Sequence, residues 1–106
     1  MDQTIKLKWI DALRSGKYAQ AIGDLHVNYN GANSYCCLGV LCDVLGADWN
    51  SQSLNGKRIP RESENYLTNE ILDEVGLDDK TQKVLGKMND GAAGFNDIAD
   101  YIEKNL

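Results

Sequence analysis

The feature that most constrains the fold is an apolar run at residues 34–45, SYCCLGVLCDVL, which contains a single charged residue. A helix built from this run would be apolar around nearly its whole circumference, and such a helix belongs in a core. With about a dozen residues, the run falls short of the roughly 20 that a membrane-spanning helix needs. We therefore expect a buried central helix from about Cys37 to Leu45, capped by Ser34 and ended by Gly46.

The two ends of the chain have the pattern of amphipathic helices. Apolar residues recur with helical spacing in residues 2–15, and Gly16 is a typical residue to follow a helix. A last helix is expected over residues 95–104, with Gly94 as its N-cap. A shorter helix is expected over residues 67–75.

Two segments predict β-hairpins. Residues 25–29 alternate in polarity, the pair Asn30-Gly31 is a strong turn signal, and residues 33–36 would form the return strand. A second small hairpin is expected around Asn55-Gly56. Residues 81–88 fit either a helix or a strand, and their alternation favours a strand.

The chain has 106 residues, of which 42% are hydrophobic and 25% charged. This length fits one domain, and a chain of this size buries roughly 60–70% of its unfolded surface. We therefore expect a single α+β domain over residues 1–106. Its parts would be the buried central helix, N- and C-terminal amphipathic helices and short antiparallel β-hairpins.

The charge of the chain limits its possible partners. The formal net charge is −5, whereas a protein that binds duplex nucleic acid needs a basic footprint. Residues 62–79 hold seven acidic and no basic residues, which is typical of a solvated surface, or of a face that docks a basic protein. Just before them, residues 57–61 carry a local basic cluster. No apolar leader follows Met1, so we expect neither secretion nor a membrane anchor.

Three cysteines, an odd number with two of them adjacent, do not suggest a disulfide framework and fit a reducing cytoplasm. Cys36, Cys37 and Cys42 also lack the paired spacing of a zinc site, so no metal is expected. Free cysteine usually packs as a small apolar residue. The alternative is a nucleophile activated by His26, the one histidine, although no catalytic motif surrounds the cysteines. We expect no catalytic residue and no cofactor.

Several residues could hold a small phosphorylated ligand, although each also has an ordinary structural or surface role. Residues 89–94, NDGAAG, form a glycine-rich turn before the last helix, where a backbone can approach a ligand and free N–H groups are available. Arginine binds phosphate with two parallel hydrogen bonds, and aromatic rings stack on bases. The candidate ligand-binding residues are Arg14, Arg58, Arg61, Asn89, Asp90 and Phe95.

Three motifs also carry a family resemblance. They are WIDALRSGKY at residues 9–18, YCCLGVLCD at residues 35–43, and the end of the chain from MND at residues 88–90 to FNDIADYIE at residues 95–103. The chain resembles a group of small proteins of tailed phages and prophages, most of them uncharacterised. It departs from them at Gly94, where the group has a serine before the last helix.

The resemblance implies a phage protein that acts in the cytoplasm of the host cell. It further suggests similarity to Thoeris-type anti-defence sponges, which bind a nucleotide-derived immune signal, a cyclic ADP-ribose isomer or a cyclic oligonucleotide, without cleaving it. We expect a non-enzymatic homo-oligomer that binds such a small ligand, and neither duplex nucleic acid nor a membrane. The alternatives are an acidic protein-interaction module that inhibits a host protein, and a small cysteine-dependent hydrolase.

Overall fold

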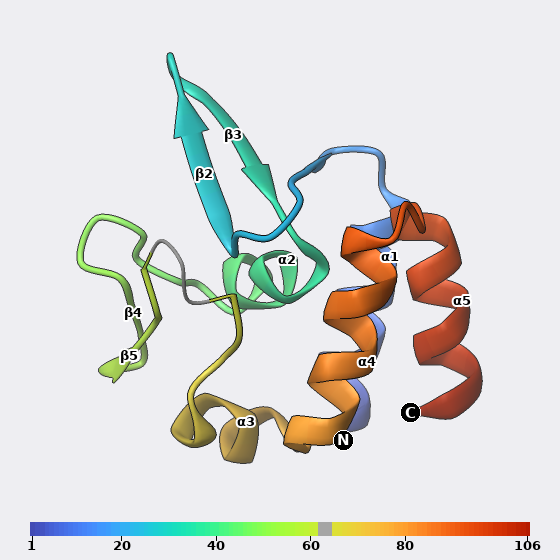
Figure 1. The fold of residues 1–106 in the computed structure, drawn as a ribbon. Helices are drawn as coiled ribbons and strands as arrows, with labels where there is room; N and C mark the ends of the chain where they lie inside the picture. Colours follow the sequence, from blue (N-terminus) through green and yellow to red (C-terminus); the bar gives the residue numbers. More distant parts are fainter. Residues whose placement is uncertain (62–64) are drawn as a thin grey trace.

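Helix α2 (Cys37–Val44) lies at the centre of the fold, with the remaining elements arranged around it (Figure 1). The computed structural model describes residues 1–61 and 65–106. The α+β prediction is confirmed. The elements of the described residues are, in chain order, α1 (Gln3–Arg14), β1 (Ala19–Gln20), β2 (His26–Tyr29), β3 (Ala32–Tyr35), α2, β4 (Ser53–Leu54), β5 (Lys57–Arg58), α3 (Asn69–Val75), α4 (Asp79–Asp90) and α5 (Phe95–Asn105).

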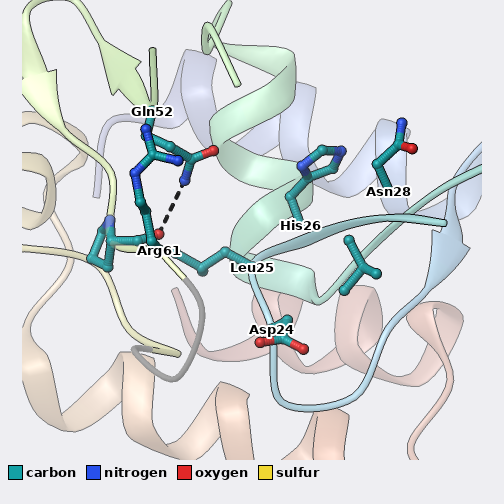
Figure 2. A pocket seen from close by; sticks show the side chains of 8 residues that line it. Asp24, Leu25, His26, Asn28, Gln52 and Arg61 are labelled. Atoms are coloured by element: carbon teal, nitrogen blue, oxygen red, sulfur yellow. Dashed lines mark hydrogen bonds between the residues drawn. The ribbon is translucent and has the colours of Figure 1, made fainter. Parts of the chain in front are cut away.

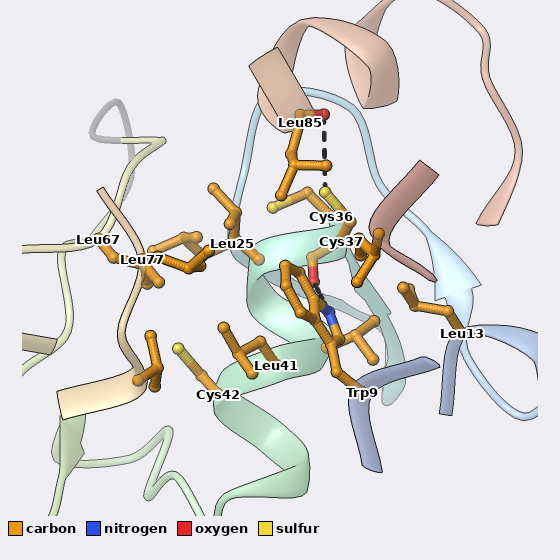
Figure 3. Packing of buried hydrophobic residues seen from close by; sticks show 14 of the residues in the cluster. Trp9, Leu13, Leu25, Cys36, Cys37, Leu41, Cys42, Leu67, Leu77 and Leu85 are labelled. Carbon is orange, nitrogen blue, oxygen red and sulfur yellow. Dashed lines mark hydrogen bonds between the residues drawn. The ribbon is translucent and has the colours of Figure 1, made fainter. Parts of the chain in front are cut away.

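The predicted burial of the central helix is confirmed. All residues from Cys37 to Cys42 are buried, and their side chains join a core to which α1, α3, α4 and α5 also contribute (Figure 3). The indole N–H of Trp9, a fully buried residue of α1, donates to the backbone oxygen of Cys37 at 2.8 Å. This bond links α1 to the start of α2. Gly39 lies on α2 directly below the backbone carbonyl of Leu25, so the segment before β2 packs on the helix at backbone distance.

The cap predicted for α2 is wrong. Ser34 lies in β3, and the N-cap residue is Cys36 in an extended conformation. The strand therefore runs almost directly into the helix. The first N–H of the helix, that of Cys37, donates instead to the side-chain oxygen of Asn89, 52 residues further along the chain, at 3.2 Å.

Strands β1, β3 and β2 form a small mixed sheet in that order. β1 pairs with β3 in parallel, and β2 pairs with β3 in an antiparallel hairpin that projects from the body of the protein (Figure 1). Asn30 and Gly31 both have positive φ, 52° and 83°, as the predicted tight turn requires. The second hairpin, β4 and β5, is also confirmed, with positive φ at Asn55 and Gly56. Strand β2 is therefore an edge of the sheet.

The strand predicted at residues 81–88 is wrong, because this segment belongs to helix α4. Its buried residues are Gln82, Leu85, Gly86 and Asn89, which have helical spacing. Three of these four are polar or lack a side chain, so the pattern of hydrophobic residues in the sequence does not indicate which face of the helix is buried. Gln82 is accommodated because its amide pairs with the backbone of Leu67 at 2.9 and 3.3 Å.

The ends of α1 and the start of α5 have the capping residues expected from the sequence. Asp2 caps α1, accepting from the N–H of Ile5 at 2.9 Å, and Gly16 after it has a φ of 75°. Gly94 is the N-cap residue of α5, as predicted. None of the helices in residues 1–61 and 65–106 is long and apolar enough to cross a membrane.

Candidate functional site

A cleft of about 400 Å³ opens between the edge strand β2 and the segment that follows β5 (Figure 2). Residues 24–28, which run along the edge of the sheet, line one wall. The described residues that line the other wall are Gln52, Pro60 and Arg61. In Figure 2 the side chains of Arg61 and Gln52 lie on one side of the cleft, with His26 and Asn28 on the other.

The wall that carries Arg61 is tied together by Gln52. Its backbone oxygen accepts from the N–H of Ile59 at 2.8 Å, and its side-chain amide donates to the backbone oxygen of Pro60 at 3.2 Å. These bonds close the ends of the β4–β5 hairpin and fix the chain just before Arg61. Gln52 adopts a φ of 53°, which is uncommon for a residue other than glycine and which persists where the surroundings enforce it.

Arg61 differs from the other candidate cations in its partners. Within residues 1–61 and 65–106, no carboxylate lies at ion-pair distance from its guanidinium. By contrast, Lys57 lies 3.8 Å from Glu74. An unpaired guanidinium beside a cleft can bind an external anion without first giving up an internal partner.

His26 is held in place on the opposite wall. Its ring stacks on Trp49 with a centroid distance of 4.7 Å and an angle of 25° between the planes, and it lies 5.0 Å from the ring of Tyr35. Its Nε2 atom is 2.9 Å from the side-chain oxygen of Asn33. The imidazole is therefore a fixed part of the wall and needs little ordering when a ligand binds.

A carboxylate accepts hydrogen bonds from two of the aromatic residues around His26. Asp43, near the end of α2, accepts from the hydroxyl of Tyr18 at 2.6 Å and from the indole N–H of Trp49 at 2.9 Å. Burial raises the pKa of Tyr18, and its hydrogen bond to Asp43 raises it further. Burial also raises the pKa of Tyr35, with a smaller effect from Asp43. Both phenols therefore keep their protons at neutral pH and serve as supports.

The structure does not bring the six predicted binding residues into one pocket. Arg61 lines the cleft, whereas the guanidinium of Arg14 lies 2.6 Å from Asp100 and 3.2 Å from Glu103 on α5. Arg58 is exposed in β5, and its backbone oxygen accepts from the hydroxyl of Thr68. The remaining three lie at α4 and α5: Asn89, Asp90 and Phe95.

Asn89 and Asp90 were expected in a flexible turn, but they form the last residues of α4. Asn89 is 1% exposed, and its amide group bonds to Cys37, Gln20 and Ala21 at 2.7–3.2 Å. The carboxylate of Asp90 accepts from the N–H of Gly23 at 2.9 Å. These bonds join α4 to the chain around β1 and to α2.

Phe95, at the start of α5, is partly buried against the core. Asp90 and Gly86, both in α4, line a separate small cavity of about 10 Å³ together with Cys36 and Tyr66.

All three cysteines are buried. Burial raises the pKa of the Cys36 thiol to about 11 and raises those of Cys37 and Cys42 as well. A thiol reacts as its thiolate, so these groups are poorly suited to nucleophilic attack. In the part of the chain that the structure describes, no group of three His, Cys, Asp or Glu side chains could hold a metal ion.

The acidic stretch is partly used within the fold. Residues 62–64 lie outside the described residues. Asp78 caps α4 by accepting from the N–H of Thr81 at 2.7 Å, and Asp79 lies 3.2 Å from Lys83. The hydrogen bonds from Thr81 lower the pKa of Asp78, and hydrogen bonds from Gln82 and, to a smaller extent, from Lys83 lower the pKa of Asp79. Two of the acidic groups are thereby already matched to local donors.

The sequence indicated His26 only as a possible activator of a cysteine, and it gave no reason to single out Asp24, Asn28 or Gln52. The alternation of residues 25–29 was a usable signal for the β2 wall. No periodic signal could find the second wall, because it meets the first only through tertiary contacts.

The profile of one protein family matches residues 1–66, more than half of the chain. The chain belongs to this family, the domain of unknown function DUF8296. No curated protein and no solved structure matches the chain. The DUF8296 match includes both described walls of the cleft, from Asp24 to Arg61, and ends before α3.

Proposed function

We propose that the protein binds a small nucleotide-derived anion in the cleft between β2 and Arg61 and holds it without cleaving it. The observation that supports this most directly is the guanidinium of Arg61, which faces the cleft and has no carboxylate partner among the described residues. The net charge of the chain is −5, so this cation provides a local positive charge in an otherwise acidic protein.

The size and lining of the cleft support a ligand of this class. Small-molecule sites usually have volumes of about 300–1,000 Å³, and this cleft has about 400 Å³. Its walls offer a cation at Arg61, an imidazole at His26 and a carboxylate at Asp24. Phosphate, sugar and base groups all find a complementary partner in that set.

The biological setting of the proposal comes from the resemblance to small phage proteins. On that basis the ligand would be an immune signal, a cyclic ADP-ribose isomer or a cyclic oligonucleotide, sequestered in the cytoplasm of the infected host. The proposal includes assembly into a homo-oligomer, in which each copy would carry its own cleft.

The geometry favours this function over the two alternatives. A cysteine hydrolase would need an accessible thiolate, whereas the thiols are buried and their pKa values are raised. An acidic docking face would draw on the carboxylates of residues 62–79, three of which already have partners within the fold: Asp78 and Asp79 at α4, and Glu74 beside Lys57.

The test is titration calorimetry with cyclic ADP-ribose, ADP-ribose and a cyclic dinucleotide, followed by mass analysis of the ligand released on denaturation. We expect one of them to bind and to be recovered intact. Arg61→Ala should weaken binding about ten- to 100-fold, since a hydrogen bond to a charged group contributes roughly 1.5–3 kcal/mol.

Arg14→Ala is the matched control. It also removes an arginine side chain, but the guanidinium of Arg14 is already paired with Asp100 and Glu103. We expect it to leave the affinity unchanged. A chemically altered ligand, or equal losses in the two variants, would contradict the proposal.

A further inference from the structure

Three side chains on one face of the β2–β3 hairpin form a continuous hydrogen-bonded chain. The N–H of Gly31 donates to the side-chain oxygen of Asn28 at 3.3 Å. The side-chain nitrogen of Asn28 then donates to the side-chain oxygen of Asn33 at 2.9 Å. The same oxygen of Asn33 is 2.9 Å from Nε2 of His26.

This series of hydrogen bonds determines which nitrogen of His26 carries the proton. A backbone N–H can only donate, so the amide of Asn28 must turn its oxygen toward Gly31 and its nitrogen toward Asn33. The nitrogen of Asn28 in turn requires an oxygen from Asn33. Because that oxygen can only accept, Nε2 of His26 must be protonated, and in the neutral ring Nδ1 is left as a hydrogen-bond acceptor.

The acceptor faces the ligand cleft. His26 lines the cleft, and stacking on Trp49 prevents the ring from turning freely. In Figure 2 the ring lies between Asn28 and the side of the cleft that carries Gln52 and Arg61. Among the described residues, no group bonds to Nδ1.

The two walls therefore differ in hydrogen-bonding character. The β2 wall presents acceptors, which are Nδ1 of His26 and the carboxylate of Asp24, while the opposite wall presents the charged donor groups of Arg61 beside the neutral amide of Gln52. A phosphate would be repelled by Asp24 and attracted by Arg61. Hydroxyl groups, which can donate, fit the β2 wall.

We infer that the cleft selects a phosphorylated ribose, with the phosphate at Arg61 and a free ribose hydroxyl donating to Nδ1 of His26. The inference rests on the proposed function and specifies its ligand class. It makes His26 a residue that determines specificity, and Asn33 the residue that positions its tautomer.

The first test uses the wild-type protein and three probes with the same phosphates and base: ADP, 2′-deoxy-ADP and 2′,3′-dideoxy-ADP. Removal of the donating hydroxyl should weaken binding about three- to tenfold, the usual effect of one lost hydrogen bond. Equal affinities would overturn the inference and leave the proposed function intact. Failure of ADP to bind, with binding of a cyclic compound, would also overturn the inference alone. If no nucleotide binds, both fail.

The second test addresses His26 directly. His26→Phe keeps a ring on Trp49 and removes Nδ1, so binding of ADP should persist through Arg61 while the preference for the hydroxyl disappears. Nitrogen-15 NMR of the single histidine reads its tautomer without ligand. We expect a protonated Nε2 in the wild type and a mixture of tautomers in Asn33→Ala, which changes an exposed residue. A protonated Nδ1 in the wild type would refute the inference.

Discussion

Replacement of Gly39 by alanine tests the packing on which both the core and the cleft depend. A Cβ atom at this position would lie 1.7 Å from the backbone oxygen of Leu25 and 2.7 Å from its carbonyl carbon. Side-chain carbons essentially never come closer than 3.0 Å to such atoms, so Leu25 and α2 must separate by at least 1.3 Å, from 1.7 to 3.0 Å. A backbone carbonyl cannot turn aside as a flexible side chain can.

The cost follows from the groups that would have to move. Overpacking costs about 1–3 kcal/mol, and a backbone displacement of at least 1.3 Å, from 1.7 to 3.0 Å, places this substitution at the upper end. The shift also strains the neighbouring hydrogen bond from the N–H of Cys36 to the oxygen of Asp24, currently 3.2 Å long, which contributes about 1 kcal/mol. Alanine recovers about 1 kcal/mol of helix propensity. The net loss of unfolding free energy should be about 3 kcal/mol.

Urea denaturation and thermal unfolding measure this loss, which corresponds to a fall in Tm of about 10–20 °C for a domain of this size. Gly86→Ala is the matched control inside another helix. Its Cβ would meet the ring of Tyr66 at 2.7 Å, and that ring can rotate away, so the change should be below about 1 kcal/mol. Equal effects of the two substitutions would show that the close approach of Leu25 to α2 is not real.

Two further predictions concern buried polar groups. Asn89→Ala leaves the N–H of Cys37 and the oxygen of Ala21 without the partners they have now, and should lower the unfolding free energy by about 2–5 kcal/mol in urea denaturation. An effect below about 1 kcal/mol would contradict the buried network. Because burial raises the pKa of the Cys36 thiol from 9.0 to about 11, the unfolded chain loses this proton at lower pH than the folded chain. The contribution of this thiol to the free energy of unfolding should therefore be fully present below pH 9.0 and decrease as the pH rises toward 11. Urea denaturation at a series of pH values measures this decrease. Unchanged stability over that range would show that the thiol is not protected.

The elements that could be predicted from the sequence are those with local signals. The apolar run gave the central helix, and Asn30-Gly31 and Asn55-Gly56 gave both hairpins, because a tight turn of this kind needs two residues that tolerate positive φ. Helix α4 was missed because its buried face holds Gln82 and Asn89. These amides pair with partners distant in sequence, and no local pattern reports such pairing.

The same reasoning explains the limits at the candidate site. Composition showed that arginines could hold a phosphate, but the choice among them depends on which carboxylates lie nearby. Arg14 meets Asp100 and Glu103 only because α1 and α5 pack together, whereas Arg61 meets the cleft. Asn33 reaches the ring of His26 across the predicted hairpin, whereas Trp49 is brought to that ring by tertiary structure.

The side-chain amide of Asn89 connects a part of the chain that the DUF8296 profile covers to a part that it does not. The segment that the profile covers is consequently smaller than the set of elements that share one core. A polypeptide ending at residue 66 would leave the start of α2 without its polar partner and the apolar sides of α1 and α2 without α4 and α5. Any relative that keeps the first segment but replaces the second must supply another oxygen at the same place.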